Sequence, residues 1–381
     1  MLKITKICAN YGPYHLARLE AAYNKFKNQE WEIFGLELAR TEEEYPWQIQ
    51  VEKFPCKIIS VIKDYPLEKA KFIPLLYKLI LLLNQISPDA VAISGYARPS
   101  MLSALLWCFW HRKPAILLSE TTEYDEPRSW WKEKIKSWLV KRYQAALVGG
   151  QPQKRYLIKL GMPADAIFLG YDVVGNHVFH PERIKCLPSP LDRPFFLTIN
   201  RFVPKKNLPF LLSAYAAYRQ VAGAKACDLV LCGDGELRLQ LEEQIVTQRL
   251  KDYIHLPGFL QQEQILPYLA HANCFIHASI QEQWGLVVNE AMAAGLPVLV
   301  SNRCGCYEDL IIEGVNGFGF DPENPQQLTE LMLKMSSADI DLQKIGEAAL
   351  EHIQKFSPDY FAQGLMQAVE YALGVHENGK K

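Results

Sequence analysis

Short apolar runs alternate with longer segments of helical periodicity along almost the whole chain, and this alternation constrains the fold most. In the first half, strands are predicted at 4–9, 33–38, 90–94, 115–119 and 145–148, and helices at 14–27, 67–85 and 99–111. Strand–helix–strand order of this kind is typical of right-handed βαβ units on a parallel sheet. The first half therefore predicts a doubly wound α/β domain.

The alternation is interrupted once, by a stretch with four prolines between His180 and Pro194, and then restarts. Strands are predicted at 195–199, 228–232, 255–256, 274–277 and 297–301, and helices at 208–218 and 236–250. We therefore predict an acceptor-binding domain at 1–180, a second Rossmann-like domain at 195–355, and a final helix at 356–381 that crosses back to the first domain. Ser357 and Pro358 suit the start of that helix. Ligands of such sheets bind beyond the carboxyl ends of the strands, here in a cleft between the predicted domains.

Composition and charge exclude several classes of protein. Of 381 residues, 49% are hydrophobic and 22% are charged, which excludes a disordered or fibrous chain. The 41 basic and 42 acidic residues nearly cancel, so no chain-wide footprint for nucleic acid exists. The nine cysteines include no C-x-x-C pair, and the spacing of Cys304 and Cys306 fits no common zinc or redox motif. We expect reduced, buried thiols in a cytoplasmic protein.

No segment resembles a targeting or membrane-spanning sequence. The first residues, MLKITKICANYG, lack the apolar core of a signal peptide. The most apolar run, at 72–83, contains a proline and a lysine and is shorter than the ~20 residues that a spanning helix needs. We interpret this run as a buried helix.

The most informative segment is 281–322. A helix is predicted to begin near Gly285 and to end at Gly295, since glycine is favoured just past a helix end. The backbone N–H groups of Trp284, Gly285 and Leu286 would form a site for a phosphate or the polar edge of a sugar. Glu282 and Glu290 are eight residues apart, about 12 Å on one helix. The two catalytic carboxylates of a glycosidase lie closer together than this. The spacing therefore favours two glutamates that contact two parts of one extended ligand over a glycosidase pair.

At this point the chain resembles the GT4 glycosyltransferases, which have the GT-B fold. The resemblance rests on several segments: EQWGLVVNEAMAAGLPV at 282–298, NRFVPKKN at 200–207, LCGDGEL at 231–237, LPGF at 256–259 and GVNGFGFDP at 314–322. It departs from the family after the strand at 297–301, where Cys306 follows Gly305 in place of a second glycine. The resemblance implies transfer of a sugar from a nucleotide-sugar to a hydroxyl, with retention of configuration and with no required metal or cofactor.

The resemblance also implies roles for particular residues. Arg201 and Lys206 would hold the donor diphosphate, a task that suits a planar guanidinium and an ammonium, with Lys205 as a competing candidate. Glu290 would accept hydrogen bonds from the ribose hydroxyls and Glu282 would contact the donor sugar. The loop that carries Phe259 and Leu260 would lie against the nucleobase. Gly233 and Gly235 fit either a close approach to a ligand or a plain turn.

In the N-terminal half, the loop after the first strand carries Gly12 and His15, where relatives have a glycine-rich loop near donor and acceptor. His15 would bind the acceptor or a phosphate, or cap locally. Glu120 follows the strand at 115–119 and would orient the acceptor hydroxyl or take its proton, or lie at the surface as a capping group.

The segment 128–143, RSWWKEKIKSWLVKRY, holds six basic residues and one acidic residue. Its membrane-surface candidates are Trp131, Lys134, Trp138 and Lys141. A basic helix with tryptophans on one face suits an anionic membrane interface, although the same stripe could pack on the sheet. We therefore expect a protein that is either free in the cytoplasm or peripheral on the inner face of the membrane.

The sequence thus predicts a glycosyltransferase that uses a UDP-, GDP- or ADP-sugar in cell-surface polysaccharide or glycolipid synthesis. Its expected partners are the nucleotide-sugar, a glycan or lipid-linked acceptor and an anionic membrane surface, and nucleic acid is excluded. Two alternatives remain open. The chain could be a non-catalytic nucleotide-sugar-binding relative that acts as a partner subunit, or a GT-B nucleotide-sugar epimerase.

Overall fold

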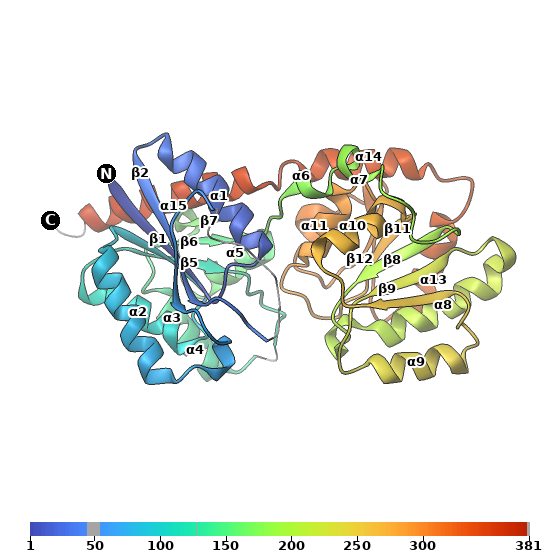
Figure 1. Ribbon diagram of the computed structural model, residues 1–381, viewed down its shortest axis with the longest axis horizontal. Helices are drawn as coiled ribbons and strands as arrows, with labels where there is room; N and C mark the ends of the chain where they lie inside the picture. Colours follow the sequence, from blue (N-terminus) through green and yellow to red (C-terminus); the bar gives the residue numbers. More distant parts are fainter. Residues whose placement is uncertain (44–53, 127, 379–381) are drawn as a thin grey trace. The chain divides into compact units, whose positions relative to one another are not determined.

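The computed structural model describes residues 1–43, 54–126 and 128–378. It divides the chain into two compact units, one of Met1–Gly175 with Ser357–Lys381 and the other of Asn176–Phe356 (Figure 1). The proline-rich stretch at 181–194, predicted as a linker, lies inside the second unit and opens with a short helix, α7 (Pro181–Ile184). The change of unit comes several residues earlier, between Gly175 and Asn176.

A parallel sheet forms the centre of the first unit. Its seven strands lie in the order β3-β2-β1-β4-β5-β6-β7. Their bounds are β1 Leu2–Cys8, β2 Trp31–Ala39, β3 Ile58–Ile62, β4 Ala90–Ser94, β5 Ala115–Ser119, β6 Ala145–Val148 and β7 Ile167–Leu169. The inner strands are buried along nearly their whole length, which explains their continuous apolar runs.

Helices cover both faces of this sheet. The connections from β3 to β6 all advance in one direction along the strand order, so right-handed crossovers place α2 (Phe72–Ile86), α3 (Pro99–Trp110) and α4 (Trp130–Val140) on the same face. The connection from β1 to β2 runs the other way and places α1 (Pro13–Lys27) on the opposite face. There α1 packs against α15 (Pro358–Asn378), which also contacts β4 to β7 (Figure 1).

The second unit repeats the design with six parallel strands in the order β10-β9-β8-β11-β12-β13. Their bounds are β8 Phe195–Ile199, β9 Asp228–Cys232, β10 Ile254–Gly258, β11 Cys274–His277, β12 Val298–Ser301 and β13 Gly317–Phe320. The helices are α6 Asn176–Phe179, α8 Leu208–Ala222, α9 Arg238–Thr247, α10 Gln262–His271, α11 Leu286–Ala293, α12 Tyr307–Leu310, α13 Pro325–Met335 and α14 Leu342–Ile353. The remaining helix of the first unit is α5, Gln151–Lys159.

Three strands escaped the sequence-based prediction: β3, β7 and β13, each at an edge of its sheet. The edge strand β13 has the sequence GFGF, and glycine has a low strand propensity, so it forms because its backbone pairs with β12. The edge strand β3 is only five residues long and pairs with β2 alone. The edge strand β7 is only three residues long and pairs with β6. All three strands are therefore specified by their partners rather than by their own sequence.

The thiols behave largely as expected. All nine cysteines are free, and eight of them are buried, while Cys186 is exposed. Burial raises the pKa of several of these thiols, for example that of Cys108 to about 12, so they remain protonated packing residues at neutral pH.

For two helices, α2 and α4, the predicted burial of apolar side chains is wrong on one face. The run at 72–83 does form α2, but only its Leu75, Leu79 and Leu83 side lies in the core, whereas Phe72, Ile73, Tyr77 and Leu81 are exposed. In α4 only Val140 is fully buried, so the alternative in which its tryptophan stripe packs on the sheet fails. Within the described residues, no helix has the length and apolarity needed to cross a membrane.

Candidate functional site

The strand order of the second unit reverses at β8, which lies between β9 and β11. Loops that follow the two central strands open at the same edge of a doubly wound sheet, and this switch point is where ligands bind. The loop after β8 carries Arg201 and Lys206, and the loop after β11 carries Glu282. The backbone N–H of Ile280 donates to the carbonyl of Lys205 at 3.0 Å, which joins the two loops.

Glu282 is the centre of a polar cluster at this edge. Lys206 Nζ forms an ion pair with Glu282 Oε2. The same oxygen lies 3.2 Å from His277 Nε2 and accepts a hydrogen bond from Ser279 Oγ, also at 3.2 Å. The carboxylate and the ammonium are largely buried and His277 is completely buried. The cluster holds one carboxylate oxygen in place and leaves the other outside these contacts.

The electrostatics of the cluster favour an ionised carboxylate beside a neutral imidazole. Burial by itself would raise the pKa of Glu282, but the hydrogen bond from His277 and the charge of Lys206 outweigh it and hold that pKa far below its usual range. Burial and the charge of Lys206 lower the pKa of His277, although Glu282 opposes this shift. His277 therefore donates to the carboxylate as a neutral group. Sequence reasoning missed it, although its place at the last position of a strand before this loop was a usable signal.

The loop that contains Glu282 is fixed by the loop after β12. Gly305 N–H donates to the carbonyl of Glu282 at 3.0 Å, and Cys306 N–H donates to that of Trp284 at 3.2 Å. Gly285 has φ of +108°, and a Cβ there would lie 3.4 Å from His277 Nε2 and 3.6 Å from Cys306 Sγ. Only glycine suits such a backbone conformation. Cys306, which replaces a family glycine, is completely buried against this turn.

The start of α11 lies where the sequence predicted it, with Gly285 before its first residue, Leu286. Glu282 precedes the helix, so the two glutamates are not on one helix. Glu290 lies within α11 and is buried. The indole of Trp284 is also buried and donates to Asn289 Oδ1 at 2.9 Å, so its contribution to a ligand site is limited to its backbone.

The glycines after β9 have a structural reason. A Cβ on Gly233 would lie 1.8 Å from the carbonyl oxygen of Asn200, so the loop after β8 leaves no room for any side chain. Gly235 is crowded in the same way by the backbone of Phe202. Close approach between two protein loops, which neither of the alternatives from the sequence had named, accounts for both glycines. In the next loop Phe259 is exposed and Leu260 is half-buried.

The first unit has its own switch point at β1, between β2 and β4. Gly12 has φ of −73° and caps α1, so its backbone conformation does not require glycine. His15, in the first turn of α1, has an Nδ1 that is shielded from solvent and lacks a hydrogen bond among the described residues. Burial, together with the charges of Lys6 and Arg18, lowers the pKa of His15 well below its usual value. It is therefore a neutral imidazole.

A second polar cluster lies at the carboxyl edge of this sheet. Glu120, after β5, shares a hydrogen bond with Asp172, which is completely buried after β7. Arg18 Nη2 lies 3.6 Å from Asp172 Oδ1. Burial and the neighbouring Glu120 raise the pKa of Asp172 well above its usual value, despite the opposing charge of Arg18. This shift favours the protonated form of the Asp172 carboxyl. The sequence indicated Glu120 but not Asp172, because the strand before it spans only three residues.

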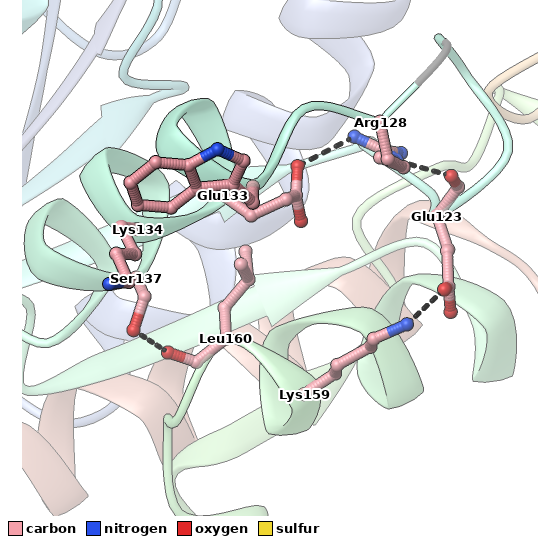
Figure 2. Close-up of a pocket in the computed structure, with 8 residues that line it drawn as sticks. Glu123, Arg128, Glu133, Lys134, Ser137, Lys159 and Leu160 are labelled. Atoms are coloured by element: carbon pink, nitrogen blue, oxygen red, sulfur yellow. Dashed lines mark hydrogen bonds and ion pairs between the residues drawn. The ribbon is translucent and has the colours of Figure 1, made fainter.

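A cavity of about 400 Å³ lies elsewhere, between α4 and α5. Figure 2 shows its lining, which includes three cations. Arg128 pairs with Glu133, Lys159 pairs with Glu123, and the ammonium of Lys134 lies 4.7 Å from the centre of the Trp130 ring. Since each cation already has a partner, this cavity is a poorer candidate for a diphosphate than the edge at Glu282.

No group of three or more His, Cys, Asp or Glu side chains suited to hold a metal ion occurs in the described part of the chain. One Asp-x-Asp tripeptide exists, at 339–341. Asp341 Oδ1 accepts the backbone N–H of Lys344 at 3.0 Å and caps α14. This motif therefore has a local structural role.

Comparisons with known proteins agree with this geometry. Residues 180–352 match the family described as glycosyl transferases group 1. The amylovoran biosynthesis glycosyltransferase AmsK of Erwinia amylovora is 29% identical over 204 residues, 52% of this chain and 49% of that protein. The mouse alpha-1,3/1,6-mannosyltransferase ALG2 is 28% identical over 217 residues, 54% of this chain and 52% of that one. The chain spans about half the length of the curated relatives that it matches.

Solved structures extend the likeness to nearly the whole fold. Anabaena HepE, solved in complex with UDP and glucose, has a TM-score of 0.76 at 18% identity, with 97% of this chain and 100% of that chain covered. The lipopolysaccharide outer core galactosyltransferase WaaB has a TM-score of 0.69 at 16% identity, with 97% and 99% covered. These likenesses, with the two parallel sheets, confirm the predicted GT-B fold.

Proposed function

We propose that the protein transfers a sugar from a nucleotide-sugar to an acceptor hydroxyl, because residues 180–352 match the family described as glycosyl transferases group 1. The observation that carries the proposal is the convergence of Lys206 and Glu282 at the switch point of the second sheet. A buried ammonium can bind the diphosphate of such a donor, and a fixed carboxylate beside it can bind the hydroxyls of its sugar. UDP in the HepE complex supports a nucleoside diphosphate as the donor class.

The donor roles follow from the chemistry of the groups. Lys206 and Arg201 would neutralise the charge that develops on the leaving diphosphate, an interaction that strengthens in the transition state. The N–H groups at the start of α11, including those of Gly285 and Leu286, would add dipoles. Glu282, held through Oε2, would present its other oxygen to sugar hydroxyls, and Glu290 would accept the ribose hydroxyls. These groups neutralise the leaving group without a metal ion, and we propose that transfer retains the anomeric configuration, as in GT4 enzymes.

The acceptor roles belong to the first unit. Glu120 would orient the acceptor hydroxyl or take its proton, and Asp172, in its protonated form, would donate a hydrogen bond to Glu120. His15, as a neutral imidazole, would bind the acceptor. We propose a glycan or lipid-linked acceptor of cell-surface polysaccharide or glycolipid synthesis, which the amylovoran biosynthesis role of the relative AmsK supports.

We also propose that α4 contacts an anionic membrane surface. Trp130, Trp131, Ile135 and Trp138 are all more than half exposed, which is unusual for large apolar side chains on a globular domain. Lys134 lies on the same helix and Lys141 directly follows its last residue; both are exposed and would bind lipid phosphates.

A donor panel tests the activity. The wild-type protein, incubated with UDP-, GDP- and ADP-sugars and an acceptor extract, should release nucleotide from at least one donor. Lys206→Met and Glu282→Gln should each lower kcat/KM by about 10²–10³-fold, the usual effect of removing a preorganised charge from a transition state. Lys225→Met is the matched control, because Lys225 precedes β9 and thus lies at the opposite edge of the sheet.

Other outcomes would change the assignment. Nucleotide binding without turnover of any donor would favour a non-catalytic partner subunit. Conversion of the donor to its epimer without acceptor would favour an epimerase. A loss of activity in Lys205→Met, with Lys206→Met unaffected, would contradict the choice between the two lysines.

A further inference from the structure

The exposed apolar side chains of α4 continue onto the two neighbouring helices. On α2, Phe72, Ile73, Tyr77 and Leu81 are each at least 41% exposed. Ile73, Tyr77 and Leu81 recur on the side of the helix opposite to its buried leucines, whereas Phe72 is the first residue of the helix, one turn before Leu75. The sequence alone assigned this run to the core, so its outer face is a finding of the structure.

The outer face of α3 has the same character. Leu106, Phe109 and Trp110 are exposed, and Trp110, at 80%, is among the most exposed large apolar residues of the chain. The helix ends there, so this group lies at its C-terminal turn. Helix α3 packs against α2 through its other side, where Trp107 Nε1 donates to Asn84 Oδ1 at 2.7 Å.

The topology brings these groups to one face. The strands β4, β5 and β6 are consecutive neighbours, so α2, α3 and α4 form one layer over the same face of the sheet. Figure 1 shows the three helices together along one side of the first unit. Side chains that point away from the sheet therefore form one outer surface, which we call the α2–α4 face.

The charges of this face are almost all positive. Helices α2 and α3 carry no acidic residue, and α4 carries one, Glu133. Exposed cations within or next to the three helices are Lys71, Lys78, Arg112, Lys132, Lys134, Lys141 and Arg142. This excess stands out in a chain whose 41 basic and 42 acidic residues nearly cancel.

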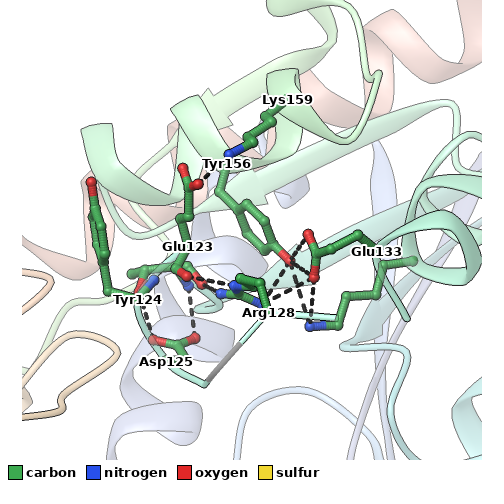
Figure 3. Close-up of polar contacts among 9 residues, drawn as sticks. Glu123, Tyr124, Asp125, Arg128, Glu133, Tyr156 and Lys159 are labelled. Atoms are coloured by element: carbon green, nitrogen blue, oxygen red, sulfur yellow. Dashed lines mark hydrogen bonds and ion pairs between the residues drawn. The ribbon is translucent and has the colours of Figure 1, made fainter. Parts of the chain in front are cut away.

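The one carboxylate of the face is neutralised inward. Figure 3 shows Glu133 with Tyr156 and Arg128. Tyr156 Oη donates to Glu133 Oε2 at 2.9 Å, Arg128 Nη1 lies 3.2 Å from Oε1, and Lys136 Nζ lies 3.4 Å from it. Glu133 therefore presents no free negative charge toward solvent, and its contacts fix the start of α4 on α5.

We propose that the whole α2–α4 face is a docking surface for an anionic lipid bilayer. Aromatic and aliphatic groups would enter the headgroup region while the surrounding lysines and arginines bind lipid phosphates. The charge distribution favours lipid over a second copy of the chain, because two such faces would repel each other. The proposal extends the contact proposed for α4 and is independent of the donor chemistry.

Vesicle flotation tests the surface. The full chain should float with vesicles of equimolar phosphatidylcholine and phosphatidylglycerol but stay in solution with phosphatidylcholine alone. The α2–α3 variant, Phe72→Ser, Ile73→Ser, Phe109→Ser and Trp110→Ser, should lose at least about tenfold in partitioning, since burial of each large apolar group contributes to binding. Lys71→Gln with Lys78→Gln should weaken binding about 30-fold at low salt. The matched control, Leu239→Ser with Val246→Ser on exposed positions of α9, should float like the wild type.

The remaining outcomes overturn the proposal. If the α2–α3 variant floats as well as the wild type, and only an α4 variant (Trp131→Ser and Trp138→Ser) loses vesicle binding, the membrane contact is confined to α4. Equal binding to neutral vesicles would remove the role of charge. A wild-type dimer that these substitutions convert to a monomer, without vesicle binding, would identify the face as a self-association surface. Nucleotide release from a soluble donor should remain unchanged in the α2–α3 variant. A failure of the donor assay would therefore concern the proposed transferase activity and not the membrane surface.

Discussion

At the scale of single residues, the fold keeps charged groups in places where their environment decides their protonation. Glu282 is buried yet ionised, because His277 and Lys206 lower its pKa, whereas burial beside Glu120 raises the pKa of Asp172. Lys6, in the middle of β1, is completely buried, and its ammonium lies 4.7 Å from the centre of the Tyr11 ring. Burial lowers the pKa of Lys6 to about 8.

Lys6→Met should therefore stabilise the protein in a pH-dependent way. The folded chain releases the Lys6 proton near pH 8, whereas the unfolded chain keeps it to about pH 10.5. Below pH 8 the wild type bears the full penalty, about 3 kcal/mol from the 1.36 kcal/mol per pKa unit, and the penalty disappears as pH rises through this window. Urea unfolding of both proteins at pH 7, 9 and 10 measures the difference. A difference that does not change with pH would contradict the assignment.

At the scale of elements, the loops after the strands carry the candidate site, and other loops hold them in place. The loop after β12 fixes the turn between Glu282 and α11 through two backbone hydrogen bonds. That turn needs the positive φ of Gly285. The motif was recognisable in the sequence. The structure adds that the side chains of His277 and Cys306 lie next to the position that a Cβ at Gly285 would occupy.

Gly285→Ala should destabilise the second unit by about 1–3 kcal/mol, the usual penalty for a strained backbone. It should also lower donor affinity, because the shift moves the carboxylate of Glu282. Gly374→Ala is the matched control: Gly374 lies in α15 with open space around its Cα, so alanine should be neutral or stabilise by up to about 1 kcal/mol. Thermal unfolding and calorimetric titration with the active nucleotide measure both effects. Equal behaviour of the two variants would refute the strain argument.

At the scale of the whole molecule, the chain returns to its first unit after building the second. Helix α15 packs against α1 and against four strands of the first sheet, and Phe361, Leu365 and Val369 are completely buried. The first unit is thus incomplete until the last helix has been made. Its stability depends on residues more than 180 positions after Gly175 in the sequence, because the whole second unit, Asn176–Phe356, lies between them in the chain.

A chain truncated after Phe356 should lose the first unit and keep the second. Removal of α15 uncovers β4 to β7 on one face of the sheet. It removes several buried apolar side chains at about 1.5–3 kcal/mol each, a total that exceeds the stability of a typical domain. Calorimetry should show that the unfolding transition of the second unit remains at an unchanged temperature. Limited proteolysis should degrade the residues before Gly175. Two intact transitions in the truncated chain would show that α15 is dispensable.

The sequence by itself determined the two parallel sheets, most of their strands and the segments that carry Lys206, Glu282 and the start of α11. These features are local: apolar runs of strand length, helical periodicity and glycines at helix ends act within a few residues. Tertiary structure alone decided that His277 and Asp172 join the polar clusters, and that α2 and α3 expose apolar faces. Proximity and burial depend on which segments pack together across the sheet, and no local pattern encodes that packing.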